Sequence, residues 1–454
     1  MAAFYTYSDC LTIGQEGSWD ALPIERAGSL MIIRTTKAST LATSVAATVL
    51  GLALANGAVA AELNFSVMES GTYDKAANQI AAEFASTGTD VKVFAFPWAV
   101  LRQNNTTDLI SGTNQYDVMS GGYYLADVYS YFSTVDDLIA KDNYAEGMIP
   151  GLLSPGRSEF VDGRSIGIPY GIDAYGLIFN KEMLEKAGVS PEFASWADLA
   201  AACEKIVAAN PGVACLSHAT GSPEQIGGFF FSGYAGTYVS SDGKYALDVP
   251  AATAAAEEIA ALWKYLPEKG TALTFDEAHQ LFKDQQAAIT VTYPSFITNS
   301  LDVEGSPVAG NWGMSKFPGQ GFPWLSLWQL FIPSATEDKD AAWAWIKAYA
   351  GPENAKRNLV EHNIGSVWLA TYEDAELKAK NAHFWPALIA GFSAAKNPPL
   401  SGEAQDLLTN TLQDIANGRV SAADGIASVA AQWANIPVPS AMLEAAAGSD
   451  LQAK

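Results

Sequence analysis

From Glu62 onward, segments in which every second residue is apolar alternate with segments in which apolar residues recur every three or four positions. The segment ELNFSVME alternates apolar and polar residues, which predicts a strand over 62–69. Apolar residues then recur every three or four positions over 73–84, which is typical of a helix that buries one face. A strand from Asp90, a helix over 101–110 and a strand over 116–119 are expected next. This β–α–β–α–β order predicts a parallel sheet with helices on its faces.

The same alternation restarts after Gly163. The run SIGIPYGIDAYGLIFNK predicts one strand, a helix follows from Lys181, and SWADLAAACEKI predicts a second helix with Ser195 as its N-cap. Further strands are expected over 214–217, in AAITVTY and, late in the chain, in LSLWQLFIPS. Two such units in series, with a strand that returns late, predict an α/β protein of two lobes. Ligands of these proteins tend to bind in the crevice between the lobes.

Length and composition agree with two lobes. The chain has 454 residues, of which 49% are hydrophobic, enough to bury two cores. The full sequence has a net charge of -23, and the first 61 residues hold three basic and four acidic side chains, so residues 62–454 carry -22. A chain this acidic is repelled by phosphate backbones and anionic lipid. We therefore expect neither nucleic acid nor a membrane surface as a partner.

The N-terminal region predicts export. Residues 31–61 combine a basic start, an apolar run over 41–55 and the small-residue site AVAA, the three parts of a secretory signal peptide. The apolar run is shorter and richer in small residues than the about 20 apolar residues of a membrane-spanning helix. We expect cleavage after Ala61 and a periplasmic location. Residues 1–30 have no export character, so we interpret them as a start-site extension before the true start at Met31.

Two cysteines, Cys203 and Cys215, follow the cleavage site. In an oxidising compartment they could close a short loop as a disulfide. Their spacing does not fix the distance between their Cα atoms, so two buried free thiols are an equal alternative.

Motifs of catalysis and of metal binding are missing from the sequence. It has no GxSxG elbow, no P-loop, no GxGxxG after a strand and no HExxH. The four histidines are scattered, and His362 stands near the end of a predicted helix, where a histidine more often interacts with the helix terminus than with a metal. We expect no catalytic residue, no metal and no cofactor.

Aromatic residues beside glycine, proline and strand ends are a stronger signal. A sugar ring packs its C–H faces on aromatic rings and needs partners for its hydroxyl groups, so sugar sites combine aromatic side chains with carboxylates and amides. For each single ring, packing in a core is the ordinary alternative, above all for Phe229–Phe231. The candidates are Tyr123, Tyr124, Tyr170, Tyr175, Phe229–Phe231, Tyr234, Tyr293, Trp324, Trp328 and Trp368.

Four segments resemble a known family. The segment DGRSIGIPYGIDAYGLIFNKEMLEKAGVSP at 162–191, followed by SWADL, resembles the family 1 extracellular solute-binding proteins of bacterial ABC importers, the carbohydrate-binding group that includes the maltose-binding protein. The segments LFKDQQAAITVTYPS, FIPSATEDKDAAWAWIKAYAGPENAK and NGRVSAADGIASVAAQW resemble later parts of that family in the same order. The resemblance covers residues 62–440.

This resemblance implies a fold and a function. The fold is the type II periplasmic-binding-protein fold, with two lobes of mostly parallel sheet flanked by helices and a multi-strand hinge. The implied lobes are 62–174 plus about 318–365, and 175–317 plus about 366–445. Such a protein is a monomer that catalyses nothing: it closes on a sugar or polyol and delivers it to a membrane permease.

The resemblance also implies ligand contacts, by position in the family's motifs. Ser295 stands where the family often has a tryptophan, so Tyr293 is expected to stack on the ligand instead. Trp328 is the strongest aromatic candidate. Instead of contacting the ligand, Asp173 could accept hydrogen bonds from backbone N–H groups of the hinge, and Glu69 could cap the helix that follows it. The whole implied set is Glu69, Ser70, Gly71, Tyr123, Tyr124, Asp173, Tyr175, Glu224, Gln225, Tyr293, Ser295, Ser326, Trp328 and Trp368.

Other functions remain open at this point. A secreted carbohydrate-active hydrolase would need two carboxylates about 5 to 10 Å apart across the scissile bond. The same fold could instead bind a polyamine, in a pocket dominated by carboxylates, or ferric iron, through several converging tyrosine and histidine ligands. The candidate residues are mostly aromatic with a few acids, which favours a sugar or polyol.

Overall fold

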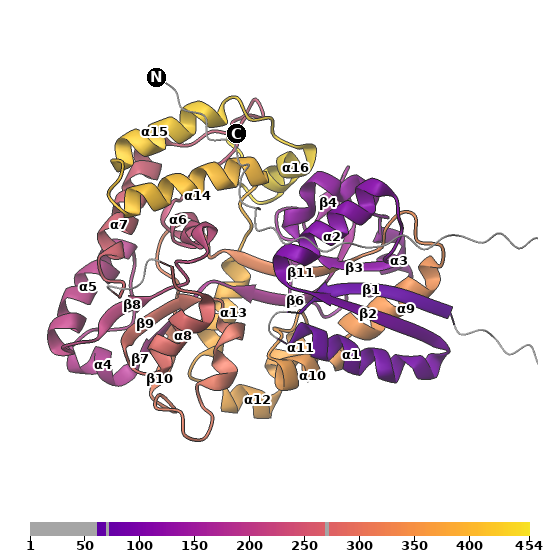
Figure 1. Cartoon of the computed structure of the whole chain (residues 1–454), viewed down its shortest axis with the longest axis horizontal. Coiled ribbons are helices and arrows are strands. Elements are labelled where there is room, and N and C mark those ends of the chain that lie inside the picture. Colours follow the sequence, from indigo (N-terminus) through magenta and orange to yellow (C-terminus); the bar gives the residue numbers. More distant parts are fainter. Residues whose placement is uncertain (1–60, 70–71, 268–271) are drawn as a thin grey trace, which may run out of the picture. The chain divides into compact units, whose positions relative to one another are not determined.

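The computed structural model describes residues 61–454 except 70–71 and 268–271 (Figure 1). The expected N-terminal extension and the signal peptide up to residue 60 lie outside the described residues. None of the described helices is both long and apolar enough to cross a bilayer.

The first sheet contains five strands in the order β2-β1-β3-β11-β6. Strand β1 pairs in parallel with β2 and with β3, which confirms the predicted parallel β–α–β–α–β unit. The late strand β11 lies between β3 and β6 and is antiparallel to both. The bounds are β1 (Ala61–Met68), β2 (Thr89–Phe96), β3 (Val118–Gly121), β6 (Gly167–Ala174) and β11 (Leu325–Phe331).

The second sheet has the order β10-β7-β9-β8, and a two-stranded hairpin pairs β4 with β5. Strand β7 is antiparallel to β10 and β9, and β8 is parallel to β9. The bounds are β7 (Gly176–Asn180), β8 (Ala214–Ser217), β9 (Ala287–Thr292), β10 (Trp312–Ser315), β4 (Phe160–Val161) and β5 (Arg164–Ser165).

The prediction of one continuous strand after Gly163 was wrong. The run forms β6 in the first sheet and β7 in the second, and Tyr175 is the single residue between them. At Tyr175 the backbone N–H donates to the carbonyl oxygen of Trp324 (3.0 Å). Every residue of β6 and β7 is buried, so hydrophobicity continues unbroken through the junction. An unbroken hydrophobic run does not show where a chain changes sheet.

Helices pack on both sheets (Figure 1). Ser195 accepts the expected hydrogen bond from a backbone N–H of the first turn of α5 at 3.1 Å, and Ser421 accepts the equivalent bond at the start of α15, also at 3.1 Å. The bounds are α1 (Tyr73–Phe84), α2 (Trp98–Ser111), α3 (Asp136–Asp142), α4 (Lys181–Lys186), α5 (Trp196–Ala209), α6 (Gly227–Gly233), α7 (Val249–Trp263), α8 (Phe275–Lys283), α9 (Lys339–Ala350), α10 (Pro352–His362), α11 (Leu369–Glu373), α12 (Ala375–Lys380), α13 (Trp385–Ala394), α14 (Gly402–Ala416), α15 (Ala422–Trp433) and α16 (Ser440–Gly448).

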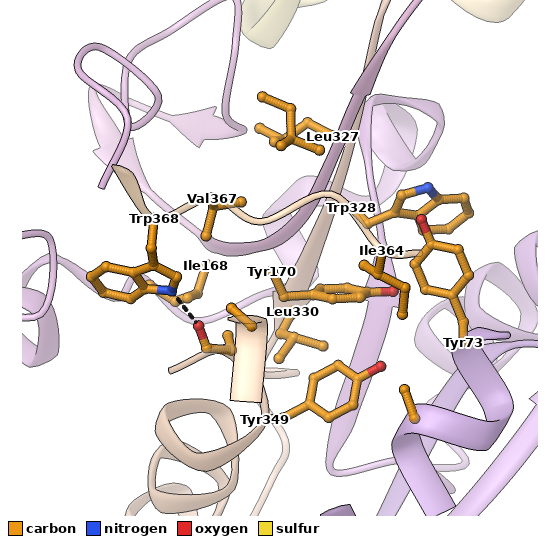
Figure 2. Close-up of a cluster of buried hydrophobic side chains, with 14 of the residues drawn as sticks. Tyr73, Ile168, Tyr170, Leu327, Trp328, Leu330, Tyr349, Ile364, Val367 and Trp368 are labelled. Atoms are coloured by element: carbon orange, nitrogen blue, oxygen red, sulfur yellow. Dashed lines mark hydrogen bonds between the residues drawn. The ribbon is translucent and has the colours of Figure 1, made fainter. Parts of the chain in front are cut away.

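Two large hydrophobic cores contain most of the buried aromatic rings. In the first, Tyr170 packs on Tyr73 and Tyr349 with ring centroids 6.0 and 5.1 Å apart (Figure 2). In the second, Trp196 packs on Phe229 at 4.7 Å. The Phe229–Phe231 run is fully buried there, as the core-packing alternative expected.

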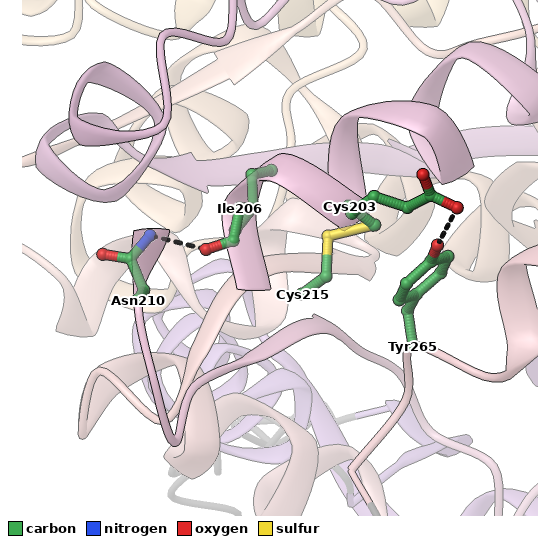
Figure 3. The surroundings of a disulfide bond; sticks show 6 residues. Cys203, Ile206, Asn210, Cys215 and Tyr265 are labelled. Atoms are coloured by element: carbon green, nitrogen blue, oxygen red, sulfur yellow. Dashed lines mark hydrogen bonds between the residues drawn. A yellow bond between two sulfur atoms is a disulfide. The ribbon is translucent and has the colours of Figure 1, made fainter. Parts of the chain in front are cut away.

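Cys203 and Cys215 form a disulfide that joins α5 to β8 (Figure 3). Their Cα atoms are 5.3 Å apart, and the pair is separated by 12 positions. In the chain-entropy view, cross-linking a loop of this size stabilises the fold by about 3 kcal/mol, because it restricts the unfolded chain.

Several segments contact both sheets or their surroundings. Helix α13 packs against β6 of the first sheet and β10 of the second. The C-terminal segment contacts the β4–β5 hairpin and the 238–239 region: α16 packs against β4, while the N–H of Tyr238 donates to the carbonyl of Leu451 (2.8 Å) and the N–H of Ala453 to that of Val239 (2.7 Å). The two sheets are therefore tied together at more places than the β6–β7 connection.

Candidate functional site

Two cavities lie beside the strands that connect the sheets. The first has a volume of about 510 Å³ and the second of about 450 Å³, and they share no lining residue. Both volumes fall within the range of small-molecule pockets, about 300 to 1,000 Å³. Volume alone therefore does not tell which one binds a ligand.

The first cavity has aromatic walls. Trp98 at the start of α2 packs on Tyr124, and Tyr124 packs on Trp328 of β11, with ring centroids 5.6 and 6.1 Å apart. Tyr123 packs on Trp324 at 6.3 Å. The aromatic lining comes from elements that surround both sheets, and consists of Trp98, Tyr123, Tyr124, Phe275, Tyr293, Phe296, Trp324 and Trp328.

Charged and amide groups complete the lining of the first cavity. Glu224, in the short 3-10 helix η3 (Pro223–Ile226), accepts a hydrogen bond from Nε2 of Gln225 at 3.2 Å. Among the described residues, no salt bridge includes any of the charged side chains that line this cavity. The polar lining includes Arg102, Asp127, Glu224, Gln225, Ser326, Gln405 and Asp406.

Two buried donors in this lining have no partner. Within the described part of the chain, neither Nε1 of Trp324 nor the hydroxyl of Tyr124 makes a hydrogen bond. Burial raises the pKa of Tyr124 well above its ordinary value and that of Tyr123 to about 12, so both hydroxyls stay protonated at neutral pH. An unpartnered buried donor destabilises a protein by about 1 to 3 kcal/mol, and a ligand oxygen would remove that penalty.

Half of the residues implied by the sequence lie together in this cavity. They are Tyr123, Tyr124, Glu224, Gln225, Tyr293, Ser326 and Trp328. Glu69 is exposed, lines neither cavity, and does not cap α1, whose N-cap is Thr72. Ser70 and Gly71 lie outside the described residues.

Asp173 and Ser295 lie at the second cavity instead. Oδ2 of Asp173 accepts from the backbone N–H of Ser295, and Oδ1 accepts from that of Ala174, both at 2.8 Å. The side chain of Asn363 donates to the carbonyl of Ser295. Burial raises the pKa of Asp173 to about 7 although these hydrogen bonds lower it. Asp173 thus ties hinge N–H groups, the alternative that the sequence left open.

Tyr175 and Trp368 line neither cavity. Tyr175 is fully buried, and its hydroxyl donates to Oε1 of Gln225. Nε1 of Trp368 donates to the carbonyl of Ala350 at 2.7 Å (Figure 2). The ring of Trp368 packs on Tyr144 with centroids 5.5 Å apart. Trp368 is therefore a core residue in this structure.

Sequence reasoning missed several lining residues. Trp98 had a usable signal: it lies two residues after the end of β2, and ligands bind at the carboxyl ends of parallel strands. Gln405 and Asp406 had none, because they reach the cavity from α14, far along the chain. Other missed lining residues with charged or aromatic side chains are Arg102, Asp127, Phe275 and Phe296, and Trp324 was named only as an aromatic candidate.

His362 is the last residue of α10, and its Nε2 bonds to Oε1 of Gln79 at 2.8 Å. Within the described ranges, no group of three or more histidine, cysteine, aspartate or glutamate side chains could hold a metal ion.

Comparisons with known proteins identify the family of the chain. The model of the family "Bacterial extracellular solute-binding protein" matches residues 69–356. A binding protein of Brucella abortus is 28% identical over 281 residues, which are 59% of this chain and 66% of that protein. The mannitol-binding protein of Pseudomonas aeruginosa is 26% identical over 308 residues, 62% of this chain and 67% of that protein. The matched regions thus span about two thirds of the length of these relatives.

Solved structures share the fold. Maltose-bound MalE3 of T. maritima has a TM-score of 0.71 at 21% identity, over 82% of this chain and 99% of that chain. A solute-binding protein of Agrobacterium radiobacter in complex with ribitol also has a TM-score of 0.71, at 18% identity, over 83% and 98%. A solute-binding protein of Agrobacterium vitis with bound D-mannitol has a TM-score of 0.67 at 21% identity, over 82% and 97%.

Proposed function

The chain belongs to the family of bacterial extracellular solute-binding proteins, and from this premise we propose that it binds a sugar or polyol in the first cavity and delivers it to the permease of an ABC importer. The family and the structural neighbours are binding proteins and not enzymes. The fold is that of the maltose-binding type of periplasmic binding proteins.

The first cavity carries this proposal. We take residues 62–174 plus about 318–365 as one lobe, and 175–317 plus about 366–445 as the other. Trp328 and Tyr123 then belong to the first lobe, and Glu224 and Tyr293 to the second. A ligand that contacts both sets favours the closed form, because only that form offers all contacts at once.

The lining favours a neutral polyhydroxyl ligand. Aromatic rings suit the C–H faces of a sugar or the carbon chain of a polyol, and the unpartnered donors of Trp324 and Tyr124 suit its oxygens. A polyamine would instead need carboxylates around each ammonium group. The neighbours whose titles name maltose, ribitol and D-mannitol support the same class.

The remaining parts of the proposal concern location and partners. We propose that residues 31–61 are a signal peptide, that the protein acts in the periplasm as a monomer, and that its only macromolecular partner in transport is the permease. Binding and release need no cofactor.

A thermal-shift screen of residues 62–454 tests the proposed ligand class. Maltose, D-mannitol, ribitol and tagatose form one set, and spermidine represents polyamines. A ligand at about 100 times its Kd adds about 2.7 kcal/mol to the unfolding free energy, which raises the Tm by a few degrees. Stabilisation by spermidine but by none of the sugars and polyols would contradict the proposal. Cleavage of maltose by the pure protein would contradict a purely binding function.

A further inference from the structure

Tyr175 occupies the one position between the two sheets at which β6 ends and β7 begins. Its ring is fully buried: it packs edge-on against Tyr293 with ring centroids 4.5 Å apart, and it stacks on Trp324 at 6.1 Å with an interplanar angle of 21°. Both partners line the first cavity. Tyr175 thus supports the cavity wall from behind without being part of it.

Helix α6 approaches the ring of Tyr175 closely because the helix residue that faces the ring, Gly228, has no side chain. A Cβ atom on Gly228 would lie 2.9 Å from two ring atoms of Tyr175, closer than ordinary van der Waals contact. The ring therefore has little room to shift, and the position of its hydroxyl group is fixed by packing.

The hydroxyl of Tyr175 begins a short chain of hydrogen bonds that ends at the cavity. It donates to Oε1 of Gln225, whose side chain is almost fully buried, and Nε2 of Gln225 donates to Oε1 of Glu224 at 3.2 Å. Burial raises the pKa of Tyr175 well above its ordinary value, so the hydroxyl keeps its proton at neutral pH. Within the described residues, the second carboxylate oxygen of Glu224 has no hydrogen-bond partner.

The direction of these bonds fixes the amide of Gln225. If the amide were rotated by half a turn, its oxygen would face the carboxylate of Glu224, and two acceptors would repel each other. The Tyr175 hydroxyl supplies the donor that holds the amide oxygen on the opposite side. Each link in the chain thus supports the orientation of the next.

We propose that Tyr175 is a positioning residue for ligand binding: through Gln225 it holds the carboxylate of Glu224 in one orientation at the wall of the first cavity. One carboxylate oxygen is occupied by Gln225, so the other is presented as a fixed acceptor for a ligand hydroxyl group. This inference rests on the proposed function, because it takes the first cavity as the ligand site.

The first arm of the test needs no ligand. In ¹⁵N-labelled protein, the side-chain amide signals of Gln225, assigned with the variant Gln225→Ala, are compared between wild type and Tyr175→Phe. This substitution keeps the ring and removes the donor, so we expect the Gln225 signals to shift. Tyr238→Phe is the matched control, because Tyr238 is fully buried in the same core and its hydroxyl has no partner among the described residues. Unchanged Gln225 signals in Tyr175→Phe would overturn the proposal.

The second arm measures affinity by calorimetric titration with D-mannitol and with maltose. We expect Tyr175→Phe to weaken binding about tenfold, the usual effect when a buried acceptor loses its donor. Tyr238→Phe should bind as wild type does. In a Glu224→Ala background, adding Tyr175→Phe should change the Kd by less than about twofold, since the carboxylate that it positions is gone.

Two results of the second arm would also overturn the proposal: wild-type affinity in Tyr175→Phe, or the same tenfold loss in the Glu224→Ala background, which a merely structural role of Tyr175 would give. If wild type binds neither probe nor any other sugar or polyol, the proposed function fails. The ligand-free arm then still decides whether Tyr175 orients Gln225.

Discussion

The first and the second cavity have similar volumes, about 510 and 450 Å³, and each is lined by tryptophans and carboxylates. They differ in what their polar groups bond to. In the first, the donors of Trp324 and Tyr124 are buried without a partner within the described chain. In the second, none of the described lining residues has a buried polar side-chain atom that lacks one.

Several polar groups of the second cavity are bonded to the protein itself. Asp173 and Asn363 hold the backbone N–H and the carbonyl of Ser295. Asp302 accepts from Nε1 of Trp312 at 2.9 Å and from the N–H of Gly310 at 2.8 Å. Composition alone would rank both cavities as sugar sites, and only unmet hydrogen-bonding capacity separates them. The hydrogen bonds of Asp173, Asn363 and Asp302 thus stabilise the fold beside the second cavity.

The largest expected difference between the cavities concerns one tryptophan from each. Trp328 lines the first cavity and Trp385 the second, and both are less than 9% exposed. We expect Trp328→Leu to weaken binding of D-mannitol or maltose about 100-fold, as loss of a central aromatic contact does. Trp385→Leu should change the Kd by less than about twofold. Calorimetric titration measures both, and urea unfolding checks that both variants are folded. Equal losses of affinity would remove the distinction between the cavities.

The unpartnered donor of Trp324 allows a sharper test. Trp324→Phe removes Nε1, so we expect the affinity for the ligand to fall about tenfold. The free energy of unfolding should fall by less than the smaller ring alone predicts, because the penalty of a buried donor without a partner is also removed. Trp345 is the control: its Nε1 is also buried and unpartnered among the described residues, but it lies in the first core and lines neither cavity. Trp345→Phe should bind as wild type does. A Trp324→Phe variant with unchanged Kd would show that no ligand oxygen meets this donor.

The buried carboxyl group of Asp173, at the second cavity, predicts that the stability of the protein depends on pH. Burial raises the pKa of Asp173 to about 7 from its ordinary value of 3.8, so between these values the folded protein holds a proton that the unfolded chain has lost. This contribution is fully present below about pH 4 and is lost as the pH rises through 7, at up to about 1.4 kcal/mol per pH unit. The Asp173→Asn variant has no carboxyl group to titrate at this position and does not lose this stability. Its free energy of unfolding minus that of wild type should therefore increase from pH 4.5 to pH 7.

Histidines do not disturb this comparison. Burial lowers the pKa of His218 and His279 to about 4, which makes their stability contribution grow with rising pH, but both are present in wild type and variant. Urea unfolding at pH 4.5, 5.5, 6.5 and 7.5 gives the difference directly. A difference between the two proteins that stays constant with pH would show that Asp173 is not protonated in the folded state.

The smallest expected effect is that of Asn363. This residue has a φ of 53°, which glycine adopts without strain, so Asn363→Gly removes the amide that donates to the carbonyl of Ser295 and to the hydroxyl of Thr298 without straining the backbone. We expect the free energy of unfolding to fall by about 1 kcal/mol and the Kd to change by less than about twofold. A change in Kd well beyond twofold would mean that the second cavity takes part in ligand binding.

Most strands and helices could be predicted because each is set by local patterns. The alternation in β1, the apolar face of α1 and the N-caps Ser195 and Ser421 all depend on residues within one or two turns. The local pattern could not show the break between β6 and β7, because both strands are buried throughout and only pairing partners far along the chain decide which sheet each joins. Only the resemblance to a family implied a lobe boundary between residues 174 and 175.

The candidate site was predicted in part for the same reason. Position in the family's motifs predicted Trp328, Tyr123 and Glu224, and all three line the first cavity. It could not show that Asp173 bonds to the backbone of Ser295, 122 positions away, or that Trp368 donates to the carbonyl of Ala350. Those contacts depend on how distant segments pack, and a carboxylate or an indole looks the same in the sequence whether its partner is a ligand or the protein.

The C-terminal segment contacts regions that lie far apart in the sequence. Helix α16 packs against β4 and contributes Ala446 to the second core, and residues 451–453 bond to Tyr238 and Val239. Closure of the two lobes, as proposed, would change the surroundings of this segment. Asp450 is exposed within it and lines neither cavity. An environment-sensitive dye on a cysteine at that position would turn the protein into an optical sensor, in which solute capture changes fluorescence without any label near the captured molecule.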